Sequence, residues 1–230
     1  MLENTYMLEW LLIIGAFVLS LVAQNSVMST YRKYSSIRSS QPLSGAQIAQ
    51  QILNNRGIHD VQVVQQRSGT LSDHYDPRKK IVALSPNIYN DNSIASVAVA
   101  AHEVGHAIQH HEGFVGIKVR DMVLPFAMIS SKLAWGVIFI SLITGFYNLT
   151  ILGVIMIGVI GLFQLVTLPV EFDASRRALK ILSADYLDSA DYSGAKTMLR
   201  AAAFTYVAAF LGTLAQMVRL LLMSNRNRRN

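Results

Sequence analysis

Long apolar runs constrain this chain more than any other feature of its sequence. They cover residues 10–23, which extend through Val27, and residues 133–170 and 199–218. About 20 apolar residues cross the hydrocarbon core of a bilayer as an α-helix, and the middle run, broken at "GFYNLT" (145–150), has room for two. A composition of 52% hydrophobic and 15% charged residues is too apolar for an ordinary soluble domain. The sequence therefore predicts a membrane protein with three to four transmembrane helices.

The charges that flank the first apolar run predict its orientation. Glu3 and Glu9 precede the run, whereas a cleaved signal peptide would begin with basic residues. Arg32, Lys33 and Arg38 follow it, and basic residues favour the cytoplasmic side of a membrane. We therefore expect an uncleaved anchor whose N-terminus lies outside, with the chain from about residue 30 onward in the cytoplasm.

The net charge and the cysteine content exclude several classes of function. The formal net charge is +6, but the basic residues cluster beside apolar segments, which favours contact with lipid over nucleic acid. We therefore expect a lipid bilayer as a partner and no nucleic acid. The chain has no cysteine, so disulfides, thiolate zinc sites and cysteine nucleophiles are excluded.

Residues 40–120 have the pattern of a folded region outside the membrane. "SGAQIAQQILNNRG" (44–57) predicts a helix with a serine N-cap and a glycine stop, and residues 61–64 and 80–85 predict short strands. A second helix of about five turns is expected from the Asn/Ser cap of "NDNSIAS" to Gly113. With the apolar runs, this order predicts an α+β membrane protein.

The second of these helices carries the motif "HEVGH". Residues four apart share one face of a helix, so His102 and His106 can both point at one zinc ion. Glu103 lies beside that face, where a carboxylate can take a proton from an activated water and later pass it to a leaving amine. Small neighbours such as Gly105 would let another element pack closely. We interpret the motif as a metal site; the alternative is a helix whose polar side chains make hydrogen bonds in the core or face water.

The third metal ligand must come from elsewhere in the chain. His110 lies eight residues from His102, a rise of about 12 Å, which is too far for one zinc ion. The chain has five glutamates, and the two before the first span, the general base Glu103 and Glu112 at the helix end are all poorly placed. Glu171, which follows an apolar span in "LPVEFDASRRAL", is the remaining candidate.

Two further readings of the residues near Glu171 stay open. Glu171 could instead be a helix-start glutamate favoured by the helix dipole, or a partner for a neighbouring arginine. Asp173 is a competing ligand or a hydrogen-bond acceptor behind a ligating histidine, and Ser175 could fill that second role less strongly.

Two segments before the motif have possible roles in binding a substrate. In "DHYDP" (73–77), His74 or Tyr75 could donate a hydrogen bond to a developing oxyanion, whereas the aspartates and proline equally favour a plain turn. The strand "KIVALS" (80–85) could act as an open edge that pairs with an extended substrate.

Taken together, four segments resemble one known family. "LSGAQIAQQIL", "LSDHYDPRKKIVALSP", "SVAVAAHEVGHAIQH" and "LPVEFDASRRAL" are similar to the YugP-type membrane-bound neutral zinc metallopeptidases of bacteria. The resemblance implies a zincin-like peptidase core, a Zn²⁺ cofactor and a place in the bacterial cytoplasmic membrane. More distant HtpX-like peptidases carry an aspartate four residues after the ligand glutamate, where this chain has Ser175.

These observations predict a zinc endopeptidase that acts on a peptide or protein substrate, with its active site on the cytoplasmic side. The rivals are a zinc-binding scaffold or partner-binding module without activity and, less favoured, a transporter. The oligomeric state stays open. The expected segments are an anchor (1–28), a cytoplasmic zincin-like region (29–120), a transmembrane hairpin (121–170), the part with the third ligand (171–198), and an apolar helix with a basic tail (199–230).

Overall fold

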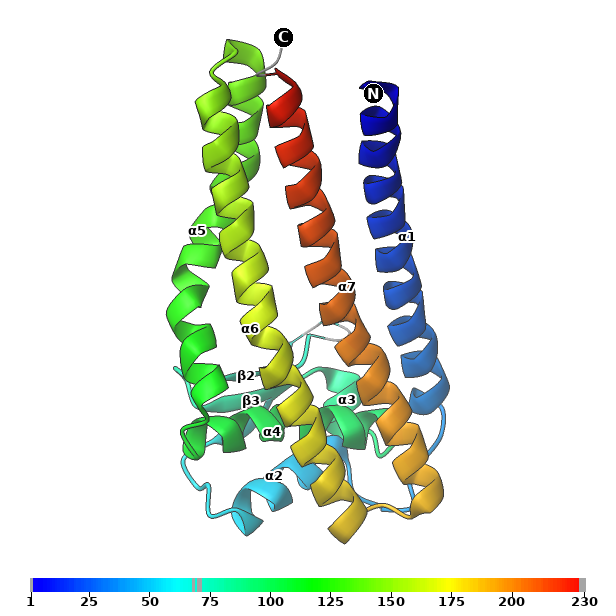
Figure 1. Cartoon of the computed structure of the whole chain (residues 1–230). Coiled ribbons are helices and arrows are strands. Elements are labelled where there is room, and N and C mark those ends of the chain that lie inside the picture. The colour runs from blue at the N-terminus through cyan, green and yellow to red at the C-terminus, as the bar shows by residue number, and fades with distance from the viewer. Residues whose placement is uncertain (1, 68, 70–71, 228–230) are drawn as a thin grey trace. The chain divides into compact units, whose positions relative to one another are not determined.

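The computed structural model describes residues 2–67, 69 and 72–227, so residues 228–230 of the predicted basic tail lie outside it. Its described part is mostly helical with one small sheet, as Figure 1 shows. The elements follow the order α1 (Leu2–Ser35), α2 (Gly45–Asn55), β1 (Gln62–Gln65), β2 (His74–Asp76), β3 (Ile81–Leu84), α3 (Pro86–Asn90), α4 (Ile94–His111), α5 (Val115–Thr144), α6 (Tyr147–Asp185) and α7 (Ser189–Asn227).

Four of these helices are long and apolar enough to cross a membrane. The candidate spans are Tyr6–Ser35, Val115–Thr144, Asn148–Asp185 and Ser189–Ser224. The last one contains the apolar run 199–218, so α7 meets the length and composition of a fourth span. The fold is therefore that of a mostly helical protein with four candidate membrane helices and a three-stranded sheet.

The helix α6 continues through Pro169, which stands inside it. Proline removes one backbone donor, but long membrane helices tolerate it where neighbouring groups satisfy the freed carbonyl. Glu171 therefore lies within a helix. The alternative that placed it at a helix start, stabilised by the helix dipole, is wrong, because the proline does not begin a new helix.

The chain forms two compact units. One consists of residues 1–24, 118–168 and 204–230, and the other of residues 25–117 and 169–203. In the first unit, a small apolar core joins α5, α6 and α7 through Ala134, Ile138, Val154, Ile157 and Leu220. The second unit contains the sheet, α4 and every predicted site residue. The five predicted segments stay a prediction.

The sheet has the strand order β1-β3-β2, with β3 in the centre. β1 pairs with β3 in parallel, Val63 opposite Val82, and β2 pairs with β3 antiparallel, Tyr75 opposite Val82. The prediction that the segment 80–85 offers an open edge to a substrate is therefore wrong. The reason is that residues 74–76, which favoured a turn by composition, form a strand that pairs with β3. The turn comes after them, where Asp76 Oδ1 accepts hydrogen bonds from the backbone of Arg78 and Lys79.

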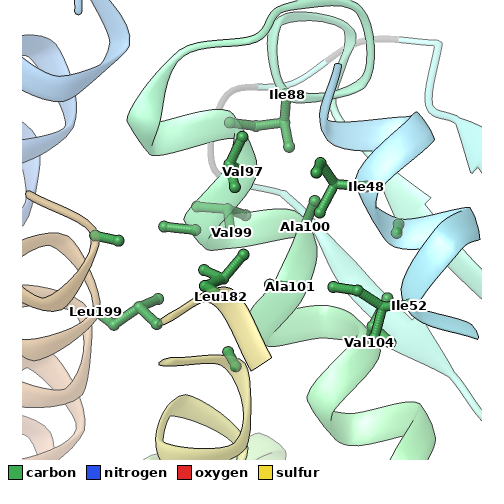
Figure 2. Close-up of a cluster of buried hydrophobic side chains, with 14 of the residues drawn as sticks. Ile48, Ile52, Ile88, Val97, Val99, Ala100, Ala101, Val104, Leu182 and Leu199 are labelled. Carbon is green, nitrogen blue, oxygen red and sulfur yellow. The ribbon is translucent and has the colours of Figure 1, made fainter. Parts of the chain in front are cut away.

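Serine caps fix the starts of α2 and α4, as the sequence predicts. Ser44 forms a capping box with Gln47, and the Ser93 side chain accepts a hydrogen bond from the backbone of Ser96. Both helices then pack into one apolar core with segments of α6 and α7, and Figure 2 shows its members. Those drawn with labels are Ile48, Ile52, Ile88, Val97, Val99, Ala100, Ala101, Val104, Leu182 and Leu199. Each large aliphatic side chain buried there contributes roughly 1.5–3 kcal/mol, which makes α4 a firm platform for the motif.

Candidate metal centre

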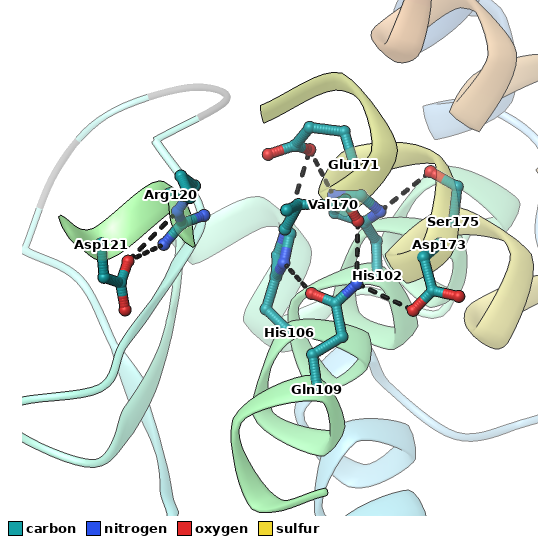
Figure 3. Close-up of polar contacts among 9 residues, drawn as sticks. All are labelled: His102, His106, Gln109, Arg120, Asp121, Val170, Glu171, Asp173 and Ser175. Atoms are coloured by element: carbon teal, nitrogen blue, oxygen red, sulfur yellow. Dashed lines mark hydrogen bonds and ion pairs between the residues drawn. The ribbon is translucent and has the colours of Figure 1, made fainter. Parts of the chain in front are cut away.

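Three potential metal ligands converge from α4 and α6. His102 Nε2 lies 3.3 Å and His106 Nε2 lies 3.6 Å from Glu171 Oε2, and one ligand atom from each residue lies within 4.8 Å of the others. Four ligands at about 2.05 Å around a tetrahedral zinc ion are separated by about 3.3 Å. The group therefore has close to the spacing that one zinc ion requires. Figure 3 shows the three side chains pointing toward one another.

The amide of Gln109 lies against the Nδ1 atom of His106. Gln109 Nε2 donates to the backbone oxygen of Val170 at 2.8 Å and to Asp173 Oδ2 at 3.0 Å, so its oxygen faces His106. That oxygen, Oε1, lies 3.0 Å from His106 Nδ1 and can only accept. Nδ1 must therefore carry the proton, and the lone pair of the neutral imidazole lies on Nε2, toward Glu171.

His102 has a partner of a different kind on the same helix as Glu171. Its Nδ1 lies 3.1 Å from Ser175 Oγ, and a hydroxyl can accept as well as donate. When Ser175 accepts, His102 also directs an Nε2 lone pair at the same point as His106. The predicted role of Ser175 behind a ligating histidine stays a prediction, and this contact supports it.

The surroundings of Glu171 fit a cation better than an apolar core. Its side chain is 6% exposed, and Oε2 has no hydrogen-bond partner although two imidazole nitrogens lie nearby. A carboxylate oxygen that faces nitrogen lone pairs at these distances is unfavourable unless a proton or a metal ion lies between them. Two imidazoles and one carboxylate are ligands that suit zinc.

The buried Glu103 adds an ionisable group beside the two histidines. It lies on α4 and is 8% exposed. Burial raises the pKa of the Glu103 carboxyl above its usual value, while the nearby His102 and His106 oppose that shift. A raised carboxyl pKa near a ligand group suits a group that takes up and releases a proton.

The contacts of Asp173 are with Gln109 and two arginines, and its roles as a competing ligand or as an acceptor behind a histidine stay predictions. Asp173 is 5% exposed and accepts hydrogen bonds from Gln109, Arg176 and Arg177. Arg177 also pairs with Glu112 at 2.5 Å, so it links the end of α4 to α6. Asp173 therefore reaches the ligand group through Gln109.

The structure places His74 and Tyr75 on the edge strand β2. His74 Nδ1 donates to the backbone oxygen of Ser72 at 2.9 Å, and the Tyr75 ring lies 5.5 Å from the His110 ring. A role for either residue as an oxyanion donor stays a prediction.

Gln109 is the residue that the sequence reasoning missed. It stands three positions after His106, on the same face of the helix, and that spacing was the available signal. Glutamine is common on helices, however, and its role depends on Val170 and Asp173, which are more than 60 residues away.

The geometry can now be compared with known proteins. The profile of the family described as "Putative neutral zinc metallopeptidase" matches residues 9–225. The chain belongs to this family. It is also 40% identical, over 218 residues, to a protein of Bacillus subtilis (strain 168) named "Putative membrane protease YugP", covering 94% of this chain and 96% of that relative. No solved structure matches the chain. Membership of the metallopeptidase family confirms the resemblance found in the sequence motifs and implies zinc as the cofactor.

Proposed function

We propose that this protein is a membrane-embedded zinc-dependent endopeptidase with a zincin-like core. The observation that carries the proposal is the convergence of His102, His106 and Glu171, from two helices, beside the buried carboxyl of Glu103. The family membership and the printed name of the Bacillus subtilis relative support the same class of activity.

His102, His106 and Glu171 would hold the zinc ion. When bound, zinc supplies Lewis-acid activation of a water molecule and of a carbonyl group. Catalytic zinc sites use three protein ligands and keep a fourth position open, whereas structural sites use four. Three candidate ligands on two helices therefore favour a catalytic site over a structural one.

Glu103 would be the general base. It accepts a proton from the attacking water and later passes this proton to the nitrogen of the leaving amine, so that a new amino terminus forms. Burial raises its pKa, which brings the carboxyl closer to the pH at which it works and makes both transfers feasible. Ser175 orients the imidazole of His102 during these steps.

The candidate spans support a place in the cytoplasmic membrane with the active site on the cytoplasmic side. If α5 and α6 both cross, the segment before α5 and the segment after α6 lie on the same side. The basic residues after α1 favour the cytoplasm for that side. The substrate would be a peptide or protein that reaches the site from there.

The test compares Glu103→Gln with Glu112→Gln in the full chain, purified in detergent. Zinc content and cleavage of quenched fluorescent peptides are measured on both. Glu103→Gln should keep stoichiometric zinc and lose about 10²–10⁴-fold of the activity, because it removes only the proton acceptor. Glu112→Gln, a half-exposed carboxyl at the end of the same helix, should keep both. Full activity of Glu103→Gln would refute the mechanism.

The same experiment separates the enzyme from a zinc-binding scaffold. A scaffold or partner-binding module needs the three ligands but has no use for Glu103. Wild-type protein that binds zinc and cleaves none of the peptides would favour the scaffold.

A further inference from the structure

The side chain of Gln109 is completely buried between α4 and α6 and uses both ends of its amide. The oxygen accepts from His106, and the nitrogen donates to Val170 and Asp173. Figure 3 shows this amide below the ligand group, between the two helices. One neutral side chain thus contacts a metal-ligand candidate on its own helix and the backbone of another helix.

The contact with Val170 concerns the carboxylate ligand. Val170 directly precedes Glu171, so a hydrogen bond of 2.8 Å to its backbone oxygen restrains the position from which the Glu171 side chain departs. The amide therefore restrains the imidazole of His106 and the backbone beside Glu171 together. Loss of the amide would loosen the placement of both ligands.

The contact with Asp173 concerns the orientation of the amide. A carboxylate can only accept, and so can the Val170 backbone oxygen. Two acceptors on one side leave a single favourable orientation for the amide, with its oxygen toward His106. Arg176 and Arg177 keep the carboxylate of Asp173 charged and in place. Asp173 thus acts on His106 without touching it.

We propose that Gln109 is a positioning residue that sets the tautomer of His106 and aligns it with Glu171, and that Asp173 influences metal binding only through Gln109. The inference rests on the proposed zinc site. Partners of ligating histidines typically contribute about 10–100-fold to metal affinity. Here the usual carboxylate partner is replaced by an amide that is itself oriented by a carboxylate.

The test measures zinc affinity by competition with a chromogenic chelator, without any substrate. Gln109→Met keeps the length of the side chain and removes its hydrogen bonds, so zinc affinity should fall by about 10–100-fold. Gln109→Glu keeps an acceptor for His106 Nδ1 but loses the two hydrogen bonds that the amide nitrogen donates, so it should recover part of that loss. If Gln109 only stabilised the helix pair, Gln109→Glu would be the worse variant, because it places a second carboxyl beside Asp173.

A double-mutant cycle tests the indirect action of Asp173. Asp173→Asn should weaken zinc binding in the wild-type background and change it less than about twofold in the Gln109→Met background. The inference would be overturned if Asp173→Asn lowered zinc affinity equally in both backgrounds. It would also be overturned if the zinc affinity of Gln109→Met lay within about twofold of the wild-type value. Ile52→Val removes a methyl group that α2 contributes to the apolar core. This variant controls for general destabilisation and should leave zinc affinity unchanged.

A measurement on the wild-type chain tests the tautomer directly, and one variant serves only to assign the signal. In metal-free protein with ¹⁵N-labelled histidine, at alkaline pH where imidazoles are neutral, His106 should carry its proton on Nδ1. The signal is assigned by its absence in His106→Gln. A proton on Nε2 would overturn the inference. Wild-type protein that binds no zinc would instead refute the proposed function.

Discussion

Gly105 faces the backbone of Ala174 so closely that a β-carbon on Gly105 would lie 2.8 Å from the Ala174 carbonyl oxygen. The sequence predicted that Gly105 would let another element pack closely against the motif helix, and α6 packs there. Glycine costs a helix about 1 kcal/mol relative to alanine. Here it allows α4 and α6 to approach until His102 Nε2 lies 3.3 Å from Glu171 Oε2.

Gly105→Ala should therefore lower both the stability and the zinc affinity of the protein. The gain in helix propensity is about 1 kcal/mol, whereas overpacking against a backbone carbonyl costs typically 1–3 kcal/mol, so the clash outweighs the gain. Gly136→Ala on α5, where nothing lies within 4 Å of the new carbon, is the matched control. Chelator competition and thermal unfolding measure the two effects. Unchanged zinc affinity in Gly105→Ala would contradict the prediction.

Glu171→Gln should remove zinc, while Asp173→Asn should leave most of it bound. The first change neutralises a carboxylate whose Oε2 faces two imidazoles, and the second changes a group that contacts Gln109 and arginines. We expect Glu171→Gln to weaken zinc binding by more than about 100-fold. Loss of a residue that only hydrogen-bonds to a metal ligand typically lowers metal affinity by about 10–100-fold, which is less than this. Elemental analysis of the purified variants checks this. If Glu171→Gln kept its zinc and Asp173→Asn lost it, Asp173 rather than Glu171 would be the third ligand.

Zinc should raise the thermal stability of the chelator-treated protein. A ligand present at 100 times its dissociation constant stabilises the folded state by about 2.7 kcal/mol, which corresponds to a rise in Tm on the order of 5–10 °C for a chain of this length. Circular dichroism follows the transition. His102→Ala and His106→Ala should abolish the rise, and magnesium should not reproduce it in the wild type. A zinc-induced rise that persists in both variants would place the binding elsewhere.

Zinc binding should weaken as the pH falls, in part through His106. Burial lowers the pKa of its imidazole. A protonated ring, however, donates a hydrogen bond to Glu171 and is attracted by its charge, and these effects outweigh burial, so that the pKa in the metal-free protein is raised overall. A raised pKa means that the protonated form stabilises the metal-free fold at low pH and that this contribution disappears as the pH rises through the raised value. Zinc must displace that proton, so its affinity drops below this pH and protons are released on binding. Titration calorimetry in buffers of different ionisation enthalpy measures the release, and no release at neutral pH would contradict the prediction.

Four membrane crossings would place the loop before α6 and the loop after it on opposite sides. The chain has no cysteine, so single cysteines can report on each side without background. Phe146→Cys, between α5 and α6, should react with a membrane-impermeant maleimide from outside intact cells, and Asp188→Cys, between α6 and α7, should react only after lysis. Labelling of both from outside would mean that α6 does not cross.

Most of the helices could be predicted from sequence because their signals are local. Apolar length marks the spans, and Ser44 and Ser93 mark helix starts within one turn of the residues they cap. The strand β2 was missed because residues 74–76 contain no apolar alternation. These residues form a strand because they pair with β3. The same pairing covers the side of β3 that the sequence predicted to be an open edge.

The sequence by itself determined the pair of histidines four residues apart, the neighbouring carboxyl and the membrane helices, since each depends on the repeat of one helix or on the length of one run. It also left Glu171 as the remaining candidate among five glutamates. Only the tertiary structure decided that Gln109 contacts Asp173, that Ser175 faces His102, and that Gly105 lies against the backbone of Ala174. Those relationships join residues more than 60 positions apart, and their geometry depends on how two helices pack, which no local pattern encodes.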